Sequence, residues 1–93
     1  MKPDPRDVRA TMNYTVEFKP KAQKDLADLT PAVRQRILPK IERLQDNLAG
    51  DVKRLTNFTP EFRLRVGDYR VLFEVEEQRV IIYRIRHRKE AYG

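Results

Sequence analysis

The sequence predicts one α+β domain in which a helical hairpin packs on one face of an antiparallel sheet. Three observations predict it: an alternating apolar pattern at the start of the domain, two segments with helical spacing after it, and three closely spaced alternating segments at the end. A chain of 93 residues has room for only one small hydrophobic core. The expected order of elements is therefore β-α-α-β-β-β.

A first strand is predicted just before Pro20, where three large side chains alternate with polar ones and so share one face: Tyr14, Val16 and Phe18. The segment before it, residues 1–12, has two prolines and mixed charge but no apolar periodicity. We therefore expect residues 1–12 to form a flexible extension and residues 13–93 to form the folded domain.

Two helices are predicted between this strand and Gly50. The first has apolar residues at helical spacing, namely Ala22, Leu26 and Leu29. The dipeptide Thr30-Pro31 ends this helix and supplies an N-cap and a first-turn proline for the second. The second helix carries one apolar stripe, made of Val33, Ile37, Ile41, Leu44 and Leu48. Gly50 stands where a C-cap glycine is expected, and Pro39 should bend the helix or tighten its first turns.

Three further strands are predicted after a polar connection: Phe62–Val66, Tyr69–Val75 and Arg79–Arg86. The turns at Gly67-Asp68 and at residues 76–78 are too short for crossover connections, so these strands should form an antiparallel meander. The first strand has to join this sheet to cover its apolar face. The helices then lie on one face, and the other face is open to solvent or a ligand.

The composition restricts the classes of function. Lys and Arg number 20 against 14 Asp and Glu, which gives a net charge of +6 and an isoelectric point near 9.9. This balance is expected of a protein with a phosphate-rich partner. Cysteine is absent and His87 is the only histidine, so thiolate chemistry is excluded and a histidine-based metal site is not expected. Without a membrane-spanning run or a secretory signal, the expected location is the cytoplasm.

Strand parity predicts that one face of the sheet is rich in arginine. Residues expected to face the helices include Leu64, Val66, Tyr69, Val71, Phe73, Val75, Ile81, Tyr83 and Ile85. The opposite parity then belongs to Arg63, Arg65, Arg70, Arg84, Arg86 and Arg88. Clustered guanidinium groups repel each other and fit phosphate geometry, so a polyanion would stabilise them. The alternative is a solvated charged face in which glutamates neutralise the arginines, the candidates being Glu74, Glu76, Glu77 and Glu90.

The end of the chain combines four positive charges with the single histidine and a tyrosine over residues 84–92. His87 has the parity of the core residues, so packing at the end of the strand is its default interpretation. Its functional interpretation is proton transfer near neutral pH. Tyr92 either covers an edge of the core or stacks on a base and contacts a ribose. The sequence leaves both pairs of interpretations open.

The stretch FRLRVGDYRVLFE at residues 62–74, followed by HRKEAY at residues 87–92, resembles the RelE/ParE toxin superfamily and its RelE branch in particular. The resemblance runs from about Asn13 to the C-terminus. It implies a toxin of a type II toxin-antitoxin system that cleaves messenger RNA in the ribosomal A site and is inhibited by a cognate antitoxin. It also implies chemistry without metal or cofactor, in which the ribose 2′-hydroxyl attacks the phosphorus and leaves a 2′,3′-cyclic phosphate.

The resemblance also implies roles for particular residues. Arg63 and Arg65 stand where the family more often has lysine, and Arg70 matches a strand arginine that contacts the scissile phosphate. Tyr92 matches a terminal tyrosine that stacks on the nucleotide. Further contacts to RNA are expected from basic residues outside this set, namely Lys53, Arg54, Arg86 and Lys89.

The resemblance leaves two residue roles to be chosen: the second phosphate-contacting arginine and the group that transfers a proton. Either Arg86 or Arg88 takes the position of a second phosphate-contacting arginine, and Arg88 is favoured because it adjoins His87. An arginine, with a pKa above about 12, is a poor general base. His87 is therefore the candidate for proton transfer.

Two other functions fit the same fold. A ParE-like toxin would poison DNA gyrase without RNA chemistry, and a non-catalytic module would only bind nucleic acid or an acidic partner on its basic face. The pair of His87 and Tyr92 favours the nuclease, because a gyrase poison has no chemical use for it. The expected partners are an antitoxin, the ribosome and its messenger, and operator DNA only in complex with the antitoxin, whereas no membrane contact is expected.

Overall fold

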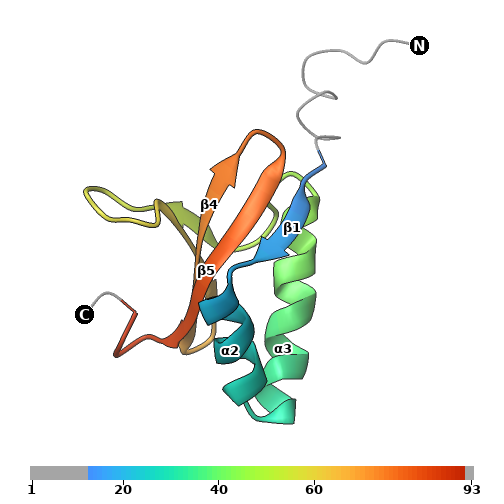
Figure 1. Cartoon of the computed structure of the whole chain (residues 1–93), viewed down its shortest axis with the longest axis vertical. Coiled ribbons are helices and arrows are strands. Elements are labelled where there is room, and N and C mark those ends of the chain that lie inside the picture. The colour runs from blue at the N-terminus through green and yellow to red at the C-terminus, as the bar shows by residue number, and fades with distance from the viewer. Residues whose placement is uncertain (1–12, 92–93) are drawn as a thin grey trace.

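The computed structural model describes residues 13–91, so the predicted N-terminal extension and Tyr92 lie outside the described residues. It contains two helices and a five-stranded sheet (Figure 1). The elements in chain order are β1 (Thr15–Phe18), α2 (Pro20–Asp28), α3 (Pro31–Glu42), the 3₁₀ turn η1 (Arg43–Gln45), β2 (Val52–Arg54), β3 (Phe62–Val66), β4 (Tyr69–Glu76) and β5 (Arg79–His87). The predicted α+β class is confirmed.

The start of α3 follows the predicted signal, but its end does not. Thr30 caps α3, its Oγ1 accepting a hydrogen bond of 3.3 Å from the backbone N–H of Val33. The predicted helix through Leu48 is wrong, because α3 ends at Glu42 and Leu48 has a φ of 57°. Pro39 offers no backbone N–H to the preceding turn, so the helix is weakened one turn before it tightens into η1. Gly50 is therefore not a C-cap.

The sheet has the strand order β1-β5-β4-β3-β2, and β3, β4 and β5 form the predicted antiparallel meander. Strand β1 joins it in parallel with β5, so the sheet is mixed and the wholly antiparallel expectation is wrong on this point. Short turns force neighbouring strands to be antiparallel, but such turns connect only the last three strands. The helical hairpin separates β1 from these strands along the chain, so β1 is free to run parallel to β5. The unpredicted β2 pairs antiparallel with β3.

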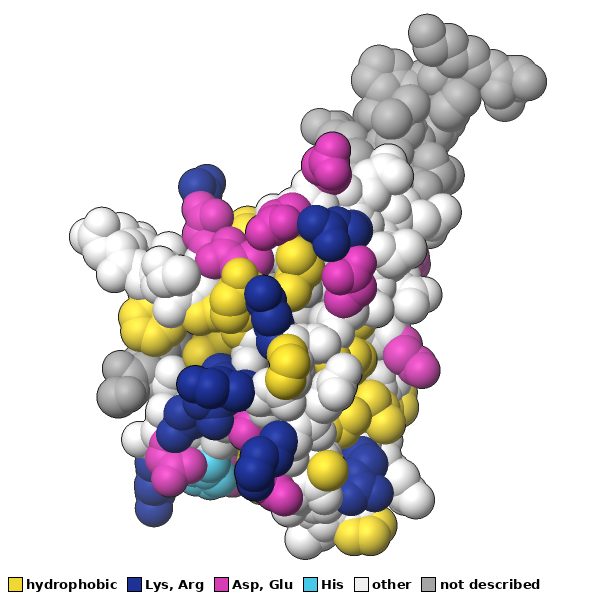
Figure 2. Space-filling view, in the orientation of Figure 1, with side chains coloured by type: hydrophobic (Ala, Val, Ile, Leu, Met, Phe, Trp, Pro, Cys, Tyr) yellow, Lys and Arg dark blue, Asp and Glu magenta, His cyan; other side chains and the backbone are white. Residues whose placement is uncertain are grey.

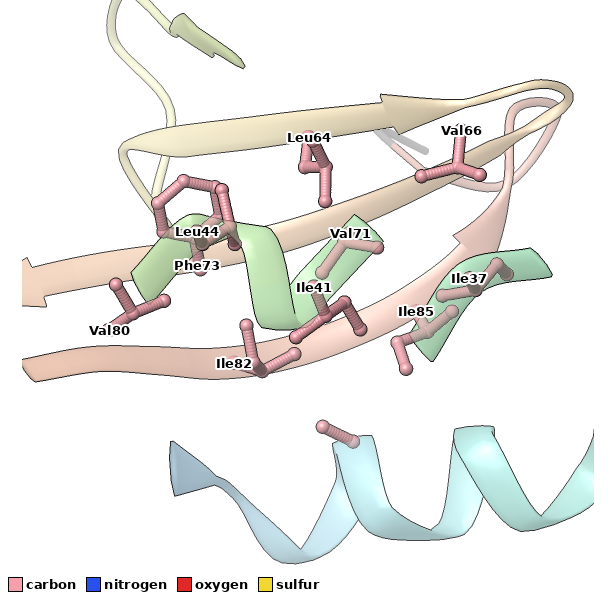
Figure 3. Close-up of a cluster of buried hydrophobic side chains, with 11 residues drawn as sticks. Ile37, Ile41, Leu44, Leu64, Val66, Val71, Phe73, Val80, Ile82 and Ile85 are labelled. Carbon is pink, nitrogen blue, oxygen red and sulfur yellow. The ribbon is translucent and has the colours of Figure 1, made fainter. Parts of the chain in front are cut away.

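The sheet and the helical hairpin enclose one hydrophobic core (Figure 3). Its buried members are Ala22, Ile37, Ile41, Leu44, Leu64, Val66, Val71, Phe73, Val80, Ile82 and Ile85. The predicted strand residues Tyr14, Val16 and Phe18 pack against it, as does Leu48. The apolar stripe after Pro31 thus faces the core even where the helix has already ended.

A β-bulge interrupts the pairing of β4 with β5. Leu72 pairs with Arg84 and Phe73 pairs with Ile82, so Tyr83 is an extra residue without a partner on β4. Val80 and Ile82 face the core before the bulge, and Ile85 faces it after the bulge. The predicted core orientation of Ile81 and Tyr83 is therefore wrong. Ile81 is buried outside the main core cluster instead.

The chain just before β1 is also bonded to the segment that follows α3. Asn13 forms an antiparallel bridge with Asp46, and the N–H of Tyr14 donates to the carbonyl of Gln45. No helix within residues 13–91 is long and apolar enough to cross a membrane.

Candidate functional site

The sheet face opposite the helices, here called the outer face, carries basic residues in two adjacent rows across the strands. The open row consists of Arg65 on β3, Arg70 on β4 and Arg86 on β5, with Arg65 paired to Arg70 and Arg70 paired to Arg86. The paired row consists of Lys53, Arg63, Leu72 and Arg84 on the four strands from β2 to β5. Directly opposed residues have Cα atoms about 4.5–5.5 Å apart, so each row brings its side chains together.

No guanidinium group of the open row forms a hydrogen bond or ion pair with a carboxylate within residues 13–91, although the charge of Arg86 acts on Asp25. Arg70 donates through Nη1 to the carbonyls of Gly67 and Tyr69, each at 3.0 Å. The side chains of Arg65 and Arg86 form neither a hydrogen bond nor an ion pair with residues in this range. Like charges directly opposed on a sheet destabilise it. A bound anion would relieve this repulsion and take up the unused donors.

The two arginines of the paired row are each bound to an aspartate. Arg63 donates through Nη1 to the carbonyl and to Oδ1 of Asp51, at 2.7 and 3.1 Å, and its side chain is only 15% exposed. Arg84 binds Asp25 of α2 through two bonds, Nε to Oδ2 at 2.8 Å and Nη2 to Oδ1 at 3.1 Å. These guanidinium groups are therefore partly neutralised within the fold.

Asp25 also closes an edge of the sheet. Strand β1 ends at Phe18, opposite Ile82, so β5 has no strand on that side beyond this point. Asp25 Oδ2 accepts a hydrogen bond of 3.0 Å from the backbone N–H of Ile85 and supplies the missing partner. Burial alone would raise the pKa of Asp25. The hydrogen bonds from Arg84 and Ile85, with the charges of Arg84 and Arg86, outweigh burial and lower the pKa below its usual value of 3.8.

The sequence left open the alternative that glutamates neutralise the arginines of this face, but Glu74 and Glu76 bond elsewhere. Glu74 accepts a hydrogen bond of 2.9 Å from the backbone N–H of Glu61, and Glu76 pairs with Arg79 at 3.0 Å. The hydrogen bond to Asp25 raises the pKa of Arg84. Two aspartates, rather than the four predicted glutamates, therefore neutralise the paired row.

A cleft of about 400 Å³ lies beside the open row and is lined by Lys53, Leu55, Thr56, Phe58, Arg63 and Arg70. Its wall is the loop between β2 and β3, which is closed at its base where the N–H of Leu55 donates to the carbonyl of Glu61. Arg54 donates through Nε to the carboxylate of Glu61 at 2.6 Å. The cleft therefore combines three cations with apolar side chains, a lining suited to a phosphate that carries a flat ring.

Arg88 and His87 lie at the end of β5 beside the open row, and His87 lines a depression together with Arg86. Arg88 lies at the turn between β3 and β4, with its N–H bonded to the carbonyl of Asp68 and its Nε 3.9 Å from Asp68 Oδ1. His87 has the opposite parity to Arg86 and lies edge-on to the ring of Tyr69, with centroids 5.6 Å apart. Its Nδ1 accepts a hydrogen bond from the N–H of Lys89. This placement agrees with the default interpretation of His87 as a packing residue.

Sequence reasoning missed three residues that shape this face. Asp25 is three positions after Ala22 on the first helical pattern, but its partner Arg84 is 59 residues away, so nothing local signalled the pair. Asp51 precedes a strand that was not predicted. Tyr83 was assigned to the core because the bulge was not foreseen. Within residues 13–91 no three His, Cys, Asp or Glu side chains are grouped so that they could hold a metal ion.

Comparisons with known proteins agree with this architecture. Residues 16–92 match a family model described as the ParE toxin of type II toxin-antitoxin system, parDE. The chain is 35% identical over 74 residues to Toxin RelE3 of Methanocaldococcus jannaschii, which covers 74% of this chain and 84% of the relative.

Two solved complexes contain a chain of similar structure. One is the RelB-RelE antitoxin-toxin complex from Methanococcus jannaschii, with 34% identity, a TM-score of 0.68, and coverage of 82% of this chain and 94% of that chain. The other is the toxin-antitoxin complex RelBE2 from Mycobacterium tuberculosis, with 28% identity, a TM-score of 0.71, and coverage of 81% and 98%.

Proposed function

Because the chain belongs to the RelE/ParE toxins of type II toxin-antitoxin systems, we propose that it is an endoribonuclease that cleaves messenger RNA in the ribosomal A site. The 2′-hydroxyl beside the scissile bond attacks the phosphorus, and the products are a 2′,3′-cyclic phosphate and a 5′-hydroxyl. The reaction uses no metal or other cofactor. Translation stops because the messenger is cut, and the expected site of action is the cytoplasm.

The observation that supports this proposal is the open row. The transition state of such an attack concentrates negative charge on the phosphorane oxygens. Arg65, Arg70 and Arg86 lie opposite one another on three adjacent strands, and no carboxylate within residues 13–91 forms a hydrogen bond or ion pair with them. The guanidinium group of Arg70 is held by its bonds to the carbonyls of Gly67 and Tyr69, so it is oriented before the charge develops.

Individual roles follow from placement and from the resemblance. Arg70, at the centre of the open row, contacts the scissile phosphate, and Arg65 and Arg86 flank it. Arg86 is favoured over Arg88 for the second phosphate contact, because Arg86 is directly opposite Arg70. Tyr92 stacks on the nucleotide beside the cut.

The other basic residues have a secondary part. Lys53 and Arg63 line the cleft that receives the neighbouring nucleotide, and Arg54 and Lys89 contact the RNA backbone further out. Proton transfer by His87 stays a prediction that its place on the helix-facing side does not support.

The proposed partners are a cognate antitoxin, the ribosome and its messenger. The related RelB-RelE structure is an antitoxin-toxin complex, and an antitoxin of this chain would inhibit it most directly by placing carboxylates on the open row. Binding of operator DNA is proposed only for the complex with antitoxin.

A second candidate is a ParE-like toxin that poisons DNA gyrase. Two observations favour it: the matching family model is that of the ParE toxin, and the only histidine packs edge-on against the ring of Tyr69. In this case the open row would contact gyrase or its DNA, and no RNA would be cut.

Primer extension on a translated message distinguishes these candidates. We expect wild type to produce cuts confined to translated codons, and Arg70→Ala to reduce them about 100-fold or more, because a preorganised charge-stabilising donor is lost. The matched control is Arg79→Ala, an arginine at the far end of β5 that pairs with Glu17 and Glu76. Intact messages together with altered plasmid supercoiling would instead identify the gyrase poison.

A further inference from the structure

The β-bulge in β5 builds a second depression on the outer face, here called the Tyr83 groove. Its volume is about 540 Å³, and it is lined by Lys19, Pro20, Lys21, Pro60, Tyr83 and Arg84. Figure 2 shows hydrophobic side chains gathered beside the loop between β2 and β3, with Lys and Arg beside and below them and Asp and Glu above. The groove therefore has an apolar floor and a basic rim, and no acidic residue within residues 13–91 lines it.

We propose that the Tyr83 groove binds one nucleotide of single-stranded RNA, with its base against the ring of Tyr83 and its phosphate at Lys19 and Lys21. This inference rests on the proposed function and adds to it a subsite for a nucleotide away from the scissile bond. The bulge is the cause, because an extra residue in a strand re-aims the side chains beside it.

The ring of Tyr83 presents a face to the groove. Lys19 Nζ lies 5.2 Å from the centroid of this ring, and both residues line the groove. An ammonium group over an aromatic face occupies the position that a stacked base would take. Lys19 is exposed, and a lysine side chain has a flexible four-carbon stem, so its ammonium group can move from the ring to a phosphate when a base enters. Pro20 and Pro60 are rigid walls that favour a flat ligand.

The groove is continuous with the rows of basic residues. Tyr83 precedes Arg84 of the paired row, and Arg86 of the open row is three positions further along β5, a distance of about 10 Å along a strand. A nucleotide near the one whose phosphate lies on the open row can therefore reach the groove. Arg84 is neutralised by Asp25, so Lys19 and Lys21, which form no ion pair within residues 13–91, supply the charge.

Binding of a single-stranded RNA oligonucleotide tests the proposal directly. The probe carries 2′-O-methyl groups and so lacks the attacking hydroxyl, and affinity is measured by fluorescence anisotropy at low salt. We expect Tyr83→Ala to weaken binding about 5- to 100-fold, the effect of removing one stacking aromatic. Tyr83→Leu keeps the apolar bulk and should behave like Tyr83→Ala, whereas Tyr83→Phe should stay within about twofold of wild type.

The salt dependence separates stacking from charge. Tyr83→Ala should leave the slope of log affinity against log salt unchanged, and Lys19→Ala should reduce it by about one, because one phosphate contact is lost. The matched control is Lys24→Ala, an exposed lysine of α2 that pairs with Asp28. An abasic nucleotide at one position of the probe should weaken binding to wild type and cause no further loss with Tyr83→Ala.

Three outcomes overturn the inference without deciding the proposed function. The first is equal RNA affinity of wild type, Tyr83→Ala and Tyr83→Leu while Arg70→Ala binds less tightly. The second is unchanged RNA affinity with weakened binding of the antitoxin, which would make the groove a peptide site. The third is that wild type does not bind the probe at low salt. Primer extension on translated messages decides the proposed function separately.

Discussion

The open row and the paired row lie side by side on the same strands, yet their arginines have different surroundings. In the paired row Arg63 and Arg84 each bind an aspartate through two hydrogen bonds to its atoms. In the open row Arg70 bonds only to backbone carbonyls, and the side chains of Arg65 and Arg86 form no hydrogen bond or ion pair within residues 13–91. Residue type and strand position alone therefore do not distinguish a structural arginine from one available to a ligand.

The difference has opposite consequences for the folded state. A guanidinium bound to a partly buried carboxylate stabilises the fold, and removing one member leaves the other without its partner. Opposed arginines without counterions reduce stability. Proteins most often tolerate such unfavourable arrangements of like charges at functional sites. We therefore expect a ligand at the open row, whereas the paired row stabilises the sheet beside it.

The largest expected effect separates Arg86 from Arg88. Arg86→Ala should reduce cleavage of a translated message about 100-fold, because a donor of the open row is removed. Arg88→Ala should change it less than about threefold, because Arg88 makes an exposed contact of 3.9 Å with Asp68. Primer extension measures both. A larger loss of cleavage with Arg88→Ala than with Arg86→Ala would identify Arg88 as the second phosphate contact. It would also contradict the proposed role of Arg86 in the open row.

A smaller effect concerns stability and tests the paired row. Asp25→Asn should lower the free energy of unfolding by about 2 kcal/mol, because the charge-assisted bonds to Arg84 are lost in a partly buried place. The matched control on the same helix is Asp28→Asn, whose exposed pair with Lys24 should contribute less than about 0.5 kcal/mol. Urea denaturation measures both, and equal effects would show that the paired row does not support the fold.

The smallest expected effect is a pH dependence of the same contact. The pKa of Asp25 is lower in the folded protein than its usual value of 3.8. Its contribution to stability is therefore fully present above that value and is lost as the pH falls through the folded pKa. The difference in unfolding free energy between wild type and Asp25→Asn should shrink as the pH falls below about 3.8. Urea denaturation over a pH series measures it, and a constant difference would contradict the assigned direction.

Most of the fold could be predicted because its signals are local. A few neighbouring residues are enough to show each signal. These signals are the alternation over residues 62–86, the helical spacing over residues 22–44 and the helix cap at Thr30-Pro31. Strand β2 has only three residues and one apolar side chain, so no period can show it. The parallel pairing of β1 depends on the path of the whole helical hairpin.

The candidate site could be predicted as a face, but not in its internal arrangement. Parity placed Arg63, Arg65 and Arg70 on the outer face correctly. It could not show which arginines are neutralised, because Asp25 and Arg84 are brought together only by the packing of α2 against β5. A single extra residue at the bulge reversed the parity of Ile81, and the orientation of Tyr83 changed with it.

The positions of Asn13 and Ala91 decide how this protein is best attached to a label or a surface. Asn13 enters beside η1, near the hairpin between β4 and β5, whereas Ala91 follows β5 near the turn between β3 and β4, at the end of the sheet that carries the open row (Figure 1). A tether joined ahead of Asn13 starts away from the open row. One joined behind Ala91 starts next to them, so immobilisation through the amino-terminal side leaves the outer face accessible.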